Sequence, residues 1–416
     1  MPKIRHINSP HPLYWLQKGI IMNILFFRFN NIYEPDVISA FESFGIHVIT
    51  KSATQGSGSF SSETIDIVSK CIMDSQNART PLMFVFSINF NPSISEICEK
   101  LNTLYVCWSV DCPVIELFST SIKNKCNRIF LFDRAQYQRF KSYNPACIHH
   151  LPLGANVQRL DHTIAGITEA DRQQFCSDIS FVGSLYSDLN PLNQMQLDDF
   201  TRGYINGIVE AQLKVFGYNF IEETLPDSII SSIKGSPVDQ CTPGFLESID
   251  RYTVAHSFIG MQIAETERIR TLNMLSQNLP LNLYTKSDAS AIPLANMKGT
   301  AHTFHEMPKI FHLSKINLNI TMRPIQTGLS LRIFDVLGSG GFLITNYQPE
   351  LEDMFQIGTD LETYTSLEEL FDKCNYYLSH EDERRNIAQN GYQKVKQLYT
   401  CENRLAQLIS TISSLQ

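Results

Sequence analysis

The sequence has no surplus of basic residues and no basic run. Lys and Arg total 34 against 42 Asp and Glu, which gives a formal net charge of −8. Proteins that hold nucleic acid meet the phosphate backbone with clustered Lys and Arg. The charge balance therefore argues against a nucleic-acid partner.

Paired cysteines are also missing. The 10 cysteines are scattered, and no two of them form the C-x-x-C pair that is typical of zinc sites and redox motifs. Several lie in apolar segments, as Cys107 does in LYVCW. Buried, reduced thiols are typical of the cytoplasm, so the sequence predicts a cytoplasmic protein.

No stable membrane span is expected. The apolar segment from Gly19 to Phe29 is interrupted by Asn23 and Arg28. It is also much shorter than the ~20 residues that a spanning helix needs, and no small-residue cleavage site follows it. We interpret it as leading into the first strand, and two interpretations of residues 1–21 stay open, a disordered leader and an upstream start before Met22.

What the chain does contain is a regular alternation of short apolar runs and amphipathic segments. Between residues 22 and 155 the runs predicted to be strands are NILFFR, IHVIT, LMFVFSI, LYVCW, RIFLFD and CIHHLP. Helical segments follow Glu34, Ser62, Ser93, Pro113 and Arg134, and Ser93 with Glu96 has the spacing of a capping box. Strands that alternate with helices predict parallel β-α-β units, so residues 22–155 are predicted to form a Rossmann-like domain.

A second domain of the same kind is predicted for residues 156–400, after a hinge at LPLGAN. Its first strand, from Ile179 to Val182, runs into Gly183 and Ser184, a weak phosphate-binding pattern. About residues 190–266 show no strand pattern and predict a helical insertion. The insertion can recognise an acceptor, bind a partner or serve packing, and residues 401–416 are expected to be a C-terminal helix.

The stretch from Lys309 to Glu350 contains the largest number of features that suggest a ligand site. A strand around Ile316–Ile320 is followed by a loop with Gly328 and Ser330, and a helical pattern runs from Leu329 to Leu337. Helix N-termini bind anions, and Arg332 and Asp335, three residues apart, share one helix face. This pattern suits a phosphate and a sugar hydroxyl pair. It also fits an ordinary strand–helix–strand unit with a surface ion pair, and the spacing leaves both interpretations open.

Several phrases resemble one known family. They are KINLNIT, the G-x-x-x-R-x-F-D pattern of Gly328, Arg332, Phe334 and Asp335, GGFLIT, SHEDERRNIAQNGY, and upstream WSVDCP, LFDRAQY, LPLGAN, FVGS, ETERIRTLNMLS and LYTKSD. From about Met22 to its end the chain resembles the CgeB-like (spore maturation protein) glycosyltransferases. The resemblance implies an α/β GT-B architecture, in which two Rossmann-like domains face a cleft and the C-terminal half carries the helical insertion.

That resemblance also implies a hexosyltransferase-type activity, in which a nucleoside-diphosphate sugar, UDP-linked by preference, donates to a hydroxyl of a glycan or protein. The implied donor-binding residues are Gly183, Ser184, Arg268, Arg323, Gly328, Ser330, Leu331, Arg332 and Asp335. Asp335, where the family usually has Glu, is expected to bind the ribose hydroxyls. Arg268, Arg332 and the N–H groups after Gly328 are expected to bind the diphosphate.

The resemblance further bears on mechanism. Many retaining GT-B enzymes carry an acidic residue eight positions before the ribose carboxylate, and here that position is Thr327. We therefore expect inversion, with no cofactor apart from the nucleotide sugar. No metal is expected, because no Asp-x-Asp pair lies in a suitable loop and because Arg side chains with helix N-termini can stabilise the leaving group.

An inverting transfer needs a base, and Asp111 is the candidate. It follows the apolar strand LYVCWSV and precedes Cys112-Pro113, at the strand edge where α/β folds bind ligands. An equally good interpretation makes it the N-cap of a helix after Pro113. His149 and His150 are expected to be structural, whereas His302 and His305 are expected near the nucleotide base or in no site.

Two other functions stay open at this point. A nucleotide-sugar epimerase on the same fold binds UDP equally well but needs no acceptor. A catalytically degenerate binding subunit agrees with Asp335 in place of Glu and with Thr327. The oligomeric state is not predicted from the sequence.

Overall fold

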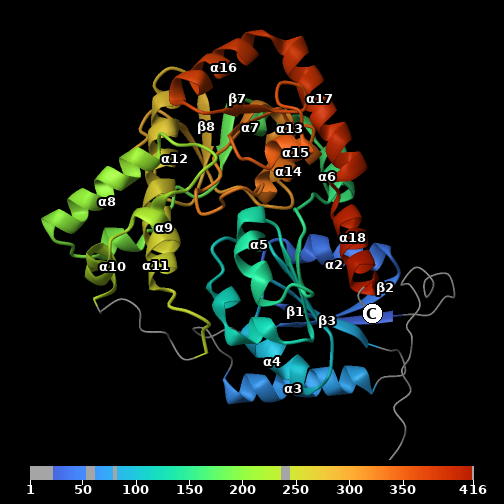
Figure 1. Cartoon of the computed structure of the whole chain (residues 1–416). Coiled ribbons are helices and arrows are strands. Elements are labelled where there is room, and N and C mark those ends of the chain that lie inside the picture. The colour runs from blue at the N-terminus through green and yellow to red at the C-terminus, as the bar shows by residue number, and fades with distance from the viewer. Residues whose placement is uncertain (1–21, 53–60, 78–81, 236–243, 415–416) are drawn as a thin grey trace, which may run out of the picture. The chain divides into compact units, whose positions relative to one another are not determined.

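A computed structural model describes residues 22–52, 61–77, 82–235 and 244–414 (Figure 1). The predicted leader, residues 1–21, lies outside the described residues. Contacts within the chain define two compact units. The first comprises the described residues within 22–132, 137–152 and 401–414, and the second comprises the described residues within 133–136 and 153–400.

The first unit is built on a parallel sheet of 6 strands in the order β2-β1-β3-β4-β5-β6. The strands are β1 (Met22–Arg28), β2 (Ile46–Ser52), β3 (Leu82–Ile88), β4 (Tyr105–Ser109), β5 (Asn127–Leu131) and β6 (Ile148–His150). Between and after them lie α2 (Glu34–Ser43), α3 (Ser62–Gln76), α4 (Pro92–Lys100), η1 (Ile115–Phe118), η2 (Thr120–Lys123), α5 (Arg134–Phe140), η3 (Lys141–Tyr143) and α18 (Cys401–Ser414). All the strands predicted here are confirmed.

Two local predictions in the first unit are wrong. Helix α4 begins after Asn91, whose side chain accepts a hydrogen bond from the Ile94 N–H, so Ser93 is not the helix cap. Asn is a strong N-cap and Pro92 suits the first helical position, and together they move the start upstream. The segment after Pro113 forms the short 3₁₀ turns η1 and η2 in place of the predicted helix.

The second unit contains another parallel sheet of 6 strands, in the order β12-β11-β10-β7-β8-β9. Its strands are β7 (Ser177–Val182), β8 (Leu281–Tyr284), β9 (Asn296–Gly299), β10 (Ser314–Asn319), β11 (Leu343–Asn346) and β12 (Glu362–Tyr364). Its helices outside the insertion are α6 (Val157–Ala165), α7 (Glu169–Phe175), α12 (Gly260–Ser276), α13 (Met307–Leu313), α14 (Leu331–Gly338), α15 (Leu351–Met354), α16 (Leu367–Ser379) and α17 (Glu381–Leu398). Each sheet with its helices is Rossmann-like, so the chain contains two α/β units of the same kind.

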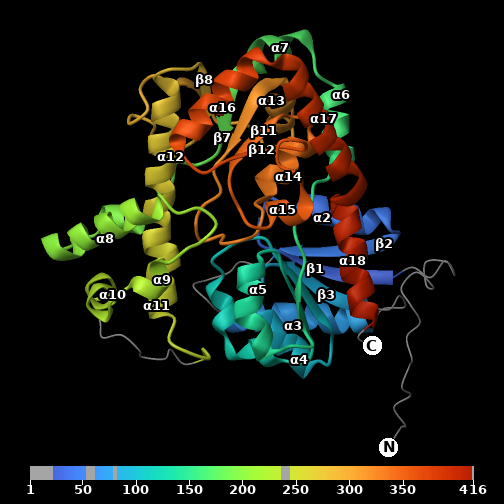
Figure 2. The same ribbon diagram turned by 45° about the horizontal axis from the view of Figure 1, so that its top comes forward.

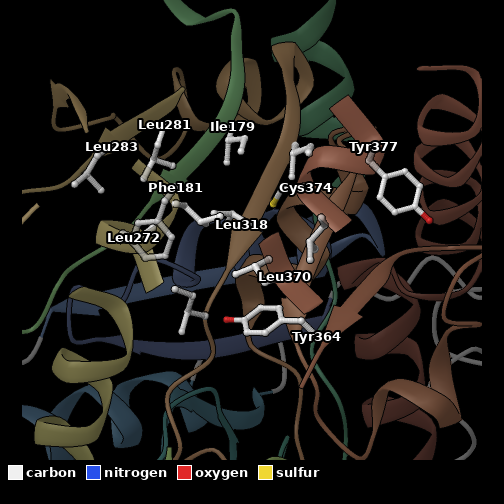
Figure 3. Packing of buried hydrophobic residues seen from close by; sticks show 14 of the residues in the cluster. Ile179, Phe181, Leu272, Leu281, Leu283, Leu318, Tyr364, Leu370, Cys374 and Tyr377 are labelled. Atoms are coloured by element: carbon white, nitrogen blue, oxygen red, sulfur yellow. The ribbon is translucent and has the colours of Figure 1, made fainter. Parts of the chain in front are cut away.

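The core of the second unit lies between its sheet and the helices α12, α16 and α17. Figure 3 shows Ile179, Phe181 and Leu281 of the strands near Leu370 and Cys374 of α16. All of these side chains are at most 2% exposed. The apolar strands thus bury their residues against helices, as a two-sided parallel sheet requires.

The predicted helical insertion is present and has a small core of its own. It consists of η4 (Pro191–Gln194), α8 (Asp199–Gln212), α9 (Ile221–Thr224), α10 (Asp227–Lys234), α11 (Asp250–Thr253) and the π-helix η5 (Val254–Ile259). In Figures 1 and 2 α8, α9, α10 and α11 lie together beside α12. Ile205, Ile229 and Ile259 are among its buried residues, so the insertion folds as a subdomain within the second unit.

Other details of the second unit differ from the predictions. The segment GYINGIVEAQLKVFGYNF has a helical period in the sequence, but in the structure it is helical only as far as Gln212. Ser366 and Glu369 have the spacing of a capping box, and Ser366 caps α16 by accepting from the Glu369 N–H. The Glu369 carboxylate, however, accepts from the Thr365 N–H, so the second half of the box does not form. Gly391 lies inside α17, where the helical pattern of the sequence also puts it. Only glycine fits there, because a Cβ would come within 2.3 Å of the Asp360 carbonyl oxygen.

Candidate functional site

The strand order of the second sheet reverses between β7 and β10, which are neighbours in the sheet although β8 and β9 lie between them in the sequence. In doubly wound sheets, ligands bind at the carboxyl ends of the strands beside such a reversal. Here Gly183 and Ser184 follow β7, and the loop 320–330 follows β10. This edge of the sheet is the candidate donor site.

Arg268 of α12 joins the ends of these two strands. Its guanidinium donates to the carbonyl oxygens of Ser184 at 2.6 Å and Ile320 at 2.7 Å. It also lies over the rings of Tyr186 and Phe181, at 4.4 and 5.4 Å from their centroids. Arg268 therefore holds the site's two loops in place while adding positive charge to it.

The turn after β7 is held by side chains that follow β8. The Ser184 and Ser287 hydroxyl oxygens are 3.2 Å apart, and Ser287 also donates to the Asp188 carboxylate. A Cβ at Gly183 would come within 3.3 Å of the Phe181 ring and 3.5 Å of Arg268 Nη1. The absent side chain therefore keeps the backbone close to the arginine.

Arg332 and Asp335 lie on α14 at the same edge. Arg332 Nη1 is 3.7 Å from Asp335 Oδ2, and its guanidinium carbon lies 5.0 Å from the Phe311 ring centroid. Burial lowers the pKa of Arg332, the Asp335 charge opposes this, and the charge of Arg268 lowers it further. Two arginines whose charges repel make this edge electropositive, which favours an anion.

Ser330 is the N-cap residue of α14, but its side chain makes no capping hydrogen bond. Its hydroxyl oxygen is 3.3 Å from that of Thr321, so it ties the two ends of the loop together. Leu331 begins the helix, as the sequence predicted within two residues. The arrangement leaves the start of α14 without a side-chain cap, as an anion-binding helix end requires.

The side chain of Arg323, which was expected to bind the donor, forms an ion pair within the protein. Its guanidinium makes a two-point ion pair with Glu267 of α12, at 2.7 and 3.1 Å, and donates to the Val215 carbonyl oxygen at 3.0 Å. Both side chains of the pair are about 5% exposed, and Arg323 also lies over the Phe216 ring. The structure thus shows Arg323 attaching the site loop to α12 and the insertion.

Sequence reasoning missed two carboxylates beside Thr327. The Thr327 hydroxyl donates to Glu350 at 2.8 Å, and the N–H groups of Gln326, Thr327 and Gly328 all point to Asp133 Oδ2 within 3.3 Å. The N–H group of Gly328, expected near a diphosphate, therefore donates to the chain's own carboxylate. No local pattern predicts this, because Asp133 is almost 200 residues away along the chain.

Asp111 lies in the first unit, in a pocket of about 370 Å³ at the carboxyl ends of β1, β3 and β4. Its carboxylate accepts hydrogen bonds from the side-chain amides of Asn89 at 2.6 Å and Asn31 at 3.4 Å. Val114 is the N-cap residue of η1, so the alternative role of Asp111 as a helix cap is wrong. Asn31 and Asn89 were not predicted from the sequence as partners of Asp111. Both residues follow the carboxyl end of a strand, and that position could have indicated them.

The four histidines of interest are spread over both units. His149 lies in β6 against the Phe130 ring, and burial followed by the charge of Arg128 lowers its pKa. His150 Nε2 lies 3.2 Å from the Phe132 carbonyl oxygen. His302 and His305 stack on each other with ring centroids 4.7 Å apart. None of these contacts involves the donor-site residues described above.

Within the part of the chain that the structure describes, no group of three His, Cys, Asp or Glu side chains is arranged to hold a metal ion. None of the described helices combines the length and apolarity needed to cross a membrane. No disulfide forms among the described cysteines.

Comparison with known proteins gives one family match. Residues 275–410 match the family model described as glycosyl transferase-like. This segment contains the strand β10, the site loop, and the helices α14, α16 and α17. No curated protein matches the sequence significantly.

Solved structures agree with the fold over nearly the whole chain. A glycosyltransferase from Rickettsia africae ESF-5 superposes with a TM-score of 0.58 at 10% identity, covering 95% of this chain and 98% of that one. Anabaena Alr3699/HepE, solved with UDP and glucose, gives 0.53 at 11% identity, with 94% and 100% covered. The sucrose-phosphate synthase tll1590 from Thermosynechococcus elongatus gives 0.54 at 10% identity, with 95% and 100% covered.

At such low identity these likenesses establish the GT-B fold. Together with the family match they define the chain as an enzyme of the glycosyltransferase type.

Proposed function

We propose that the protein transfers a sugar from a UDP-sugar to a hydroxyl group of a glycan or protein acceptor. The observation that carries this proposal is the meeting of Arg268, Arg332 and Asp335 at the carboxyl edge of β7 and β10. Two guanidinium groups suit a diphosphate, and a carboxylate next to them suits the ribose hydroxyls. The Anabaena structure solved with UDP and glucose supports the choice of nucleotide.

The proposed reaction is an inverting displacement without a metal. Asp111 takes the proton from the acceptor hydroxyl, the oxygen forms a bond to the anomeric carbon, and the bond from that carbon to the diphosphate oxygen breaks. The electron pair leaves with UDP, and Arg332 stabilises the charge that develops on it. Thr327 at the position of the retaining enzymes' acidic residue supports inversion.

We also propose that the protein belongs to the CgeB-like subfamily and acts in the cytoplasm. The phrases around Gly328, Arg332 and Asp335 resemble the CgeB-like glycosyltransferases, which supports that subfamily. The scattered cysteines without C-x-x-C pairs support a cytoplasmic enzyme.

A thermal-shift screen of the purified protein against UDP, GDP, dTDP and CDP, with and without magnesium, tests the donor class. A ligand at 100 times its dissociation constant adds about 2.7 kcal/mol to the free energy of unfolding, which gives a clear rise in Tm. We expect UDP to give the largest shift, with or without magnesium. A chain that responds to none of the four nucleotides is a binding subunit and contradicts the proposal.

A further inference from the structure

A second basic pocket lies at the opposite edge of the second sheet from the donor site. It holds about 170 Å³ and is formed where β10 begins at Ser314 and where Phe342 leads into β11. Among the described residues that line it, every ionisable one is basic: His312, Lys315, Arg384 and Arg385. The volume accommodates one phosphate group, since a water molecule takes about 30 Å³.

Arg384 makes this pocket unusual. It is only 5% exposed, and its guanidinium donates one hydrogen bond, from Nη1 to the Tyr377 carbonyl oxygen at 2.7 Å. Among the described residues no carboxylate lies within 4 Å of it. A buried cation without a counter-ion is costly, and the end of α16 supplies only a partial negative charge.

The charges around Arg384 do not compensate for the electrostatic cost of burying its guanidinium group. Burial lowers the pKa of Arg384, and the charge of Arg385 lowers it as well, whereas Glu381 and Asp178 act in the other direction. Those two carboxylates already pair with other cations, Glu381 with Arg385 and Asp178 with Lys315. An anion in the pocket relieves the electrostatic penalty on Arg384 directly.

The groups around Arg384 can complete an anion site. His312 Nδ1 lies 2.9 Å from the Ser339 carbonyl oxygen, so Nδ1 carries a proton and donates it there. The other ring nitrogen, Nε2, donates to an anion when the imidazole is doubly protonated. Guanidinium groups bind phosphate through two parallel hydrogen bonds. We propose that this pocket binds a phosphate group, either inorganic phosphate or that of a small phosphorylated metabolite, separately from the donor site.

The test is titration calorimetry of the full chain with inorganic phosphate and with glucose 6-phosphate, at an ionic strength held constant with chloride. We expect both to bind, and the tighter of the two identifies the source of the phosphate. Arg384→Gln should weaken binding at least about tenfold, since it removes a charge-assisted, two-point contact. Arg270→Gln, which changes an exposed arginine of α12, should leave it unchanged.

Two further variants distinguish binding in this pocket from binding at the donor site. Ala388→Glu places a carboxylate one helical turn from Arg384 on α17, so it should abolish phosphate binding while Arg384 stays in place. Arg332→Gln removes a donor-site arginine and should leave phosphate binding intact. Binding that is lost in Arg332→Gln but kept in Arg384→Gln and Ala388→Glu overturns the proposal, and so does the absence of binding to the wild-type chain.

Discussion

Arg332 is the residue on which the proposed donor site depends most directly. Its side chain is 21% exposed, beside Asp335 and close enough to Arg268 to be affected by its charge. A cation held in a partly buried site gains more from a bound anion than an exposed cation does, because water screens it less. The sequence predicted this residue from its spacing, but the spacing left open whether it was a surface ion pair.

Arg332→Gln should reduce the affinity for UDP by roughly 10- to 100-fold, which corresponds to about 1.5–3 kcal/mol for a lost charge-assisted hydrogen bond. Titration calorimetry with UDP measures the change. Arg270→Gln is the matched control, because Arg270 is an exposed arginine on α12 that pairs with Glu210. Equal affinities in the wild type and Arg332→Gln would remove Arg332 from the site.

At the scale of elements, the loop after β10 is attached to α12 and the insertion at several points. Arg323 pairs with Glu267, the Asn219 amide donates to the Arg323 carbonyl oxygen at 3.0 Å, and Gly260 packs against Pro324. A Cβ at Gly260 would come within 2.6 Å of Pro324 Cγ, so only glycine permits this approach. The insertion therefore shapes the loop that leads to α14.

The Arg323–Glu267 pair can be tested by charge removal. Glu267→Gln leaves a buried guanidinium without its carboxylate and should cost about 3–5 kcal/mol of unfolding free energy, measured by urea denaturation. The double variant Arg323→Met with Glu267→Leu removes both charges and should recover most of that stability.

The double variant also decides the role of Arg323 in donor binding. If Arg323 acts only by holding the loop, UDP affinity should return together with stability. If stability returns but UDP affinity does not, Arg323 contacts the nucleotide, as the family resemblance implied.

At the scale of the whole molecule, both sheets carry their candidate residues beside a reversal of strand order. The first sheet reverses between β1 and β3, where the Asp111 pocket lies, and the second reverses between β7 and β10. In the proposed reaction, donor binding and proton removal involve residues of different units, so a substitution in one unit should affect one activity without the other.

Asp111→Asn tests this separation. The side-chain oxygen of Asn can still accept from Asn89 and Asn31, so the pocket should keep its geometry while losing its base. We expect unchanged affinity for UDP and at least about 100-fold slower UDP release from UDP-glucose in the presence of an acceptor. Release at the wild-type rate would mean that another group takes the proton.

By itself the sequence determined the two parallel sheets, the helical insertion and the stretch from Gly328 to Asp335. Apolar runs, helical periodicity and glycine spacing are local properties, and they define these elements wherever the chain folds. Only the tertiary structure decided that Arg323 pairs with Glu267 and that Asp133 and Glu350 bind the Thr327 loop. It also decided that Arg384 is buried with no carboxylate paired to it among the residues that the structure describes. These contacts join residues that are distant along the chain or depend on what packs around them, and no local pattern encodes them.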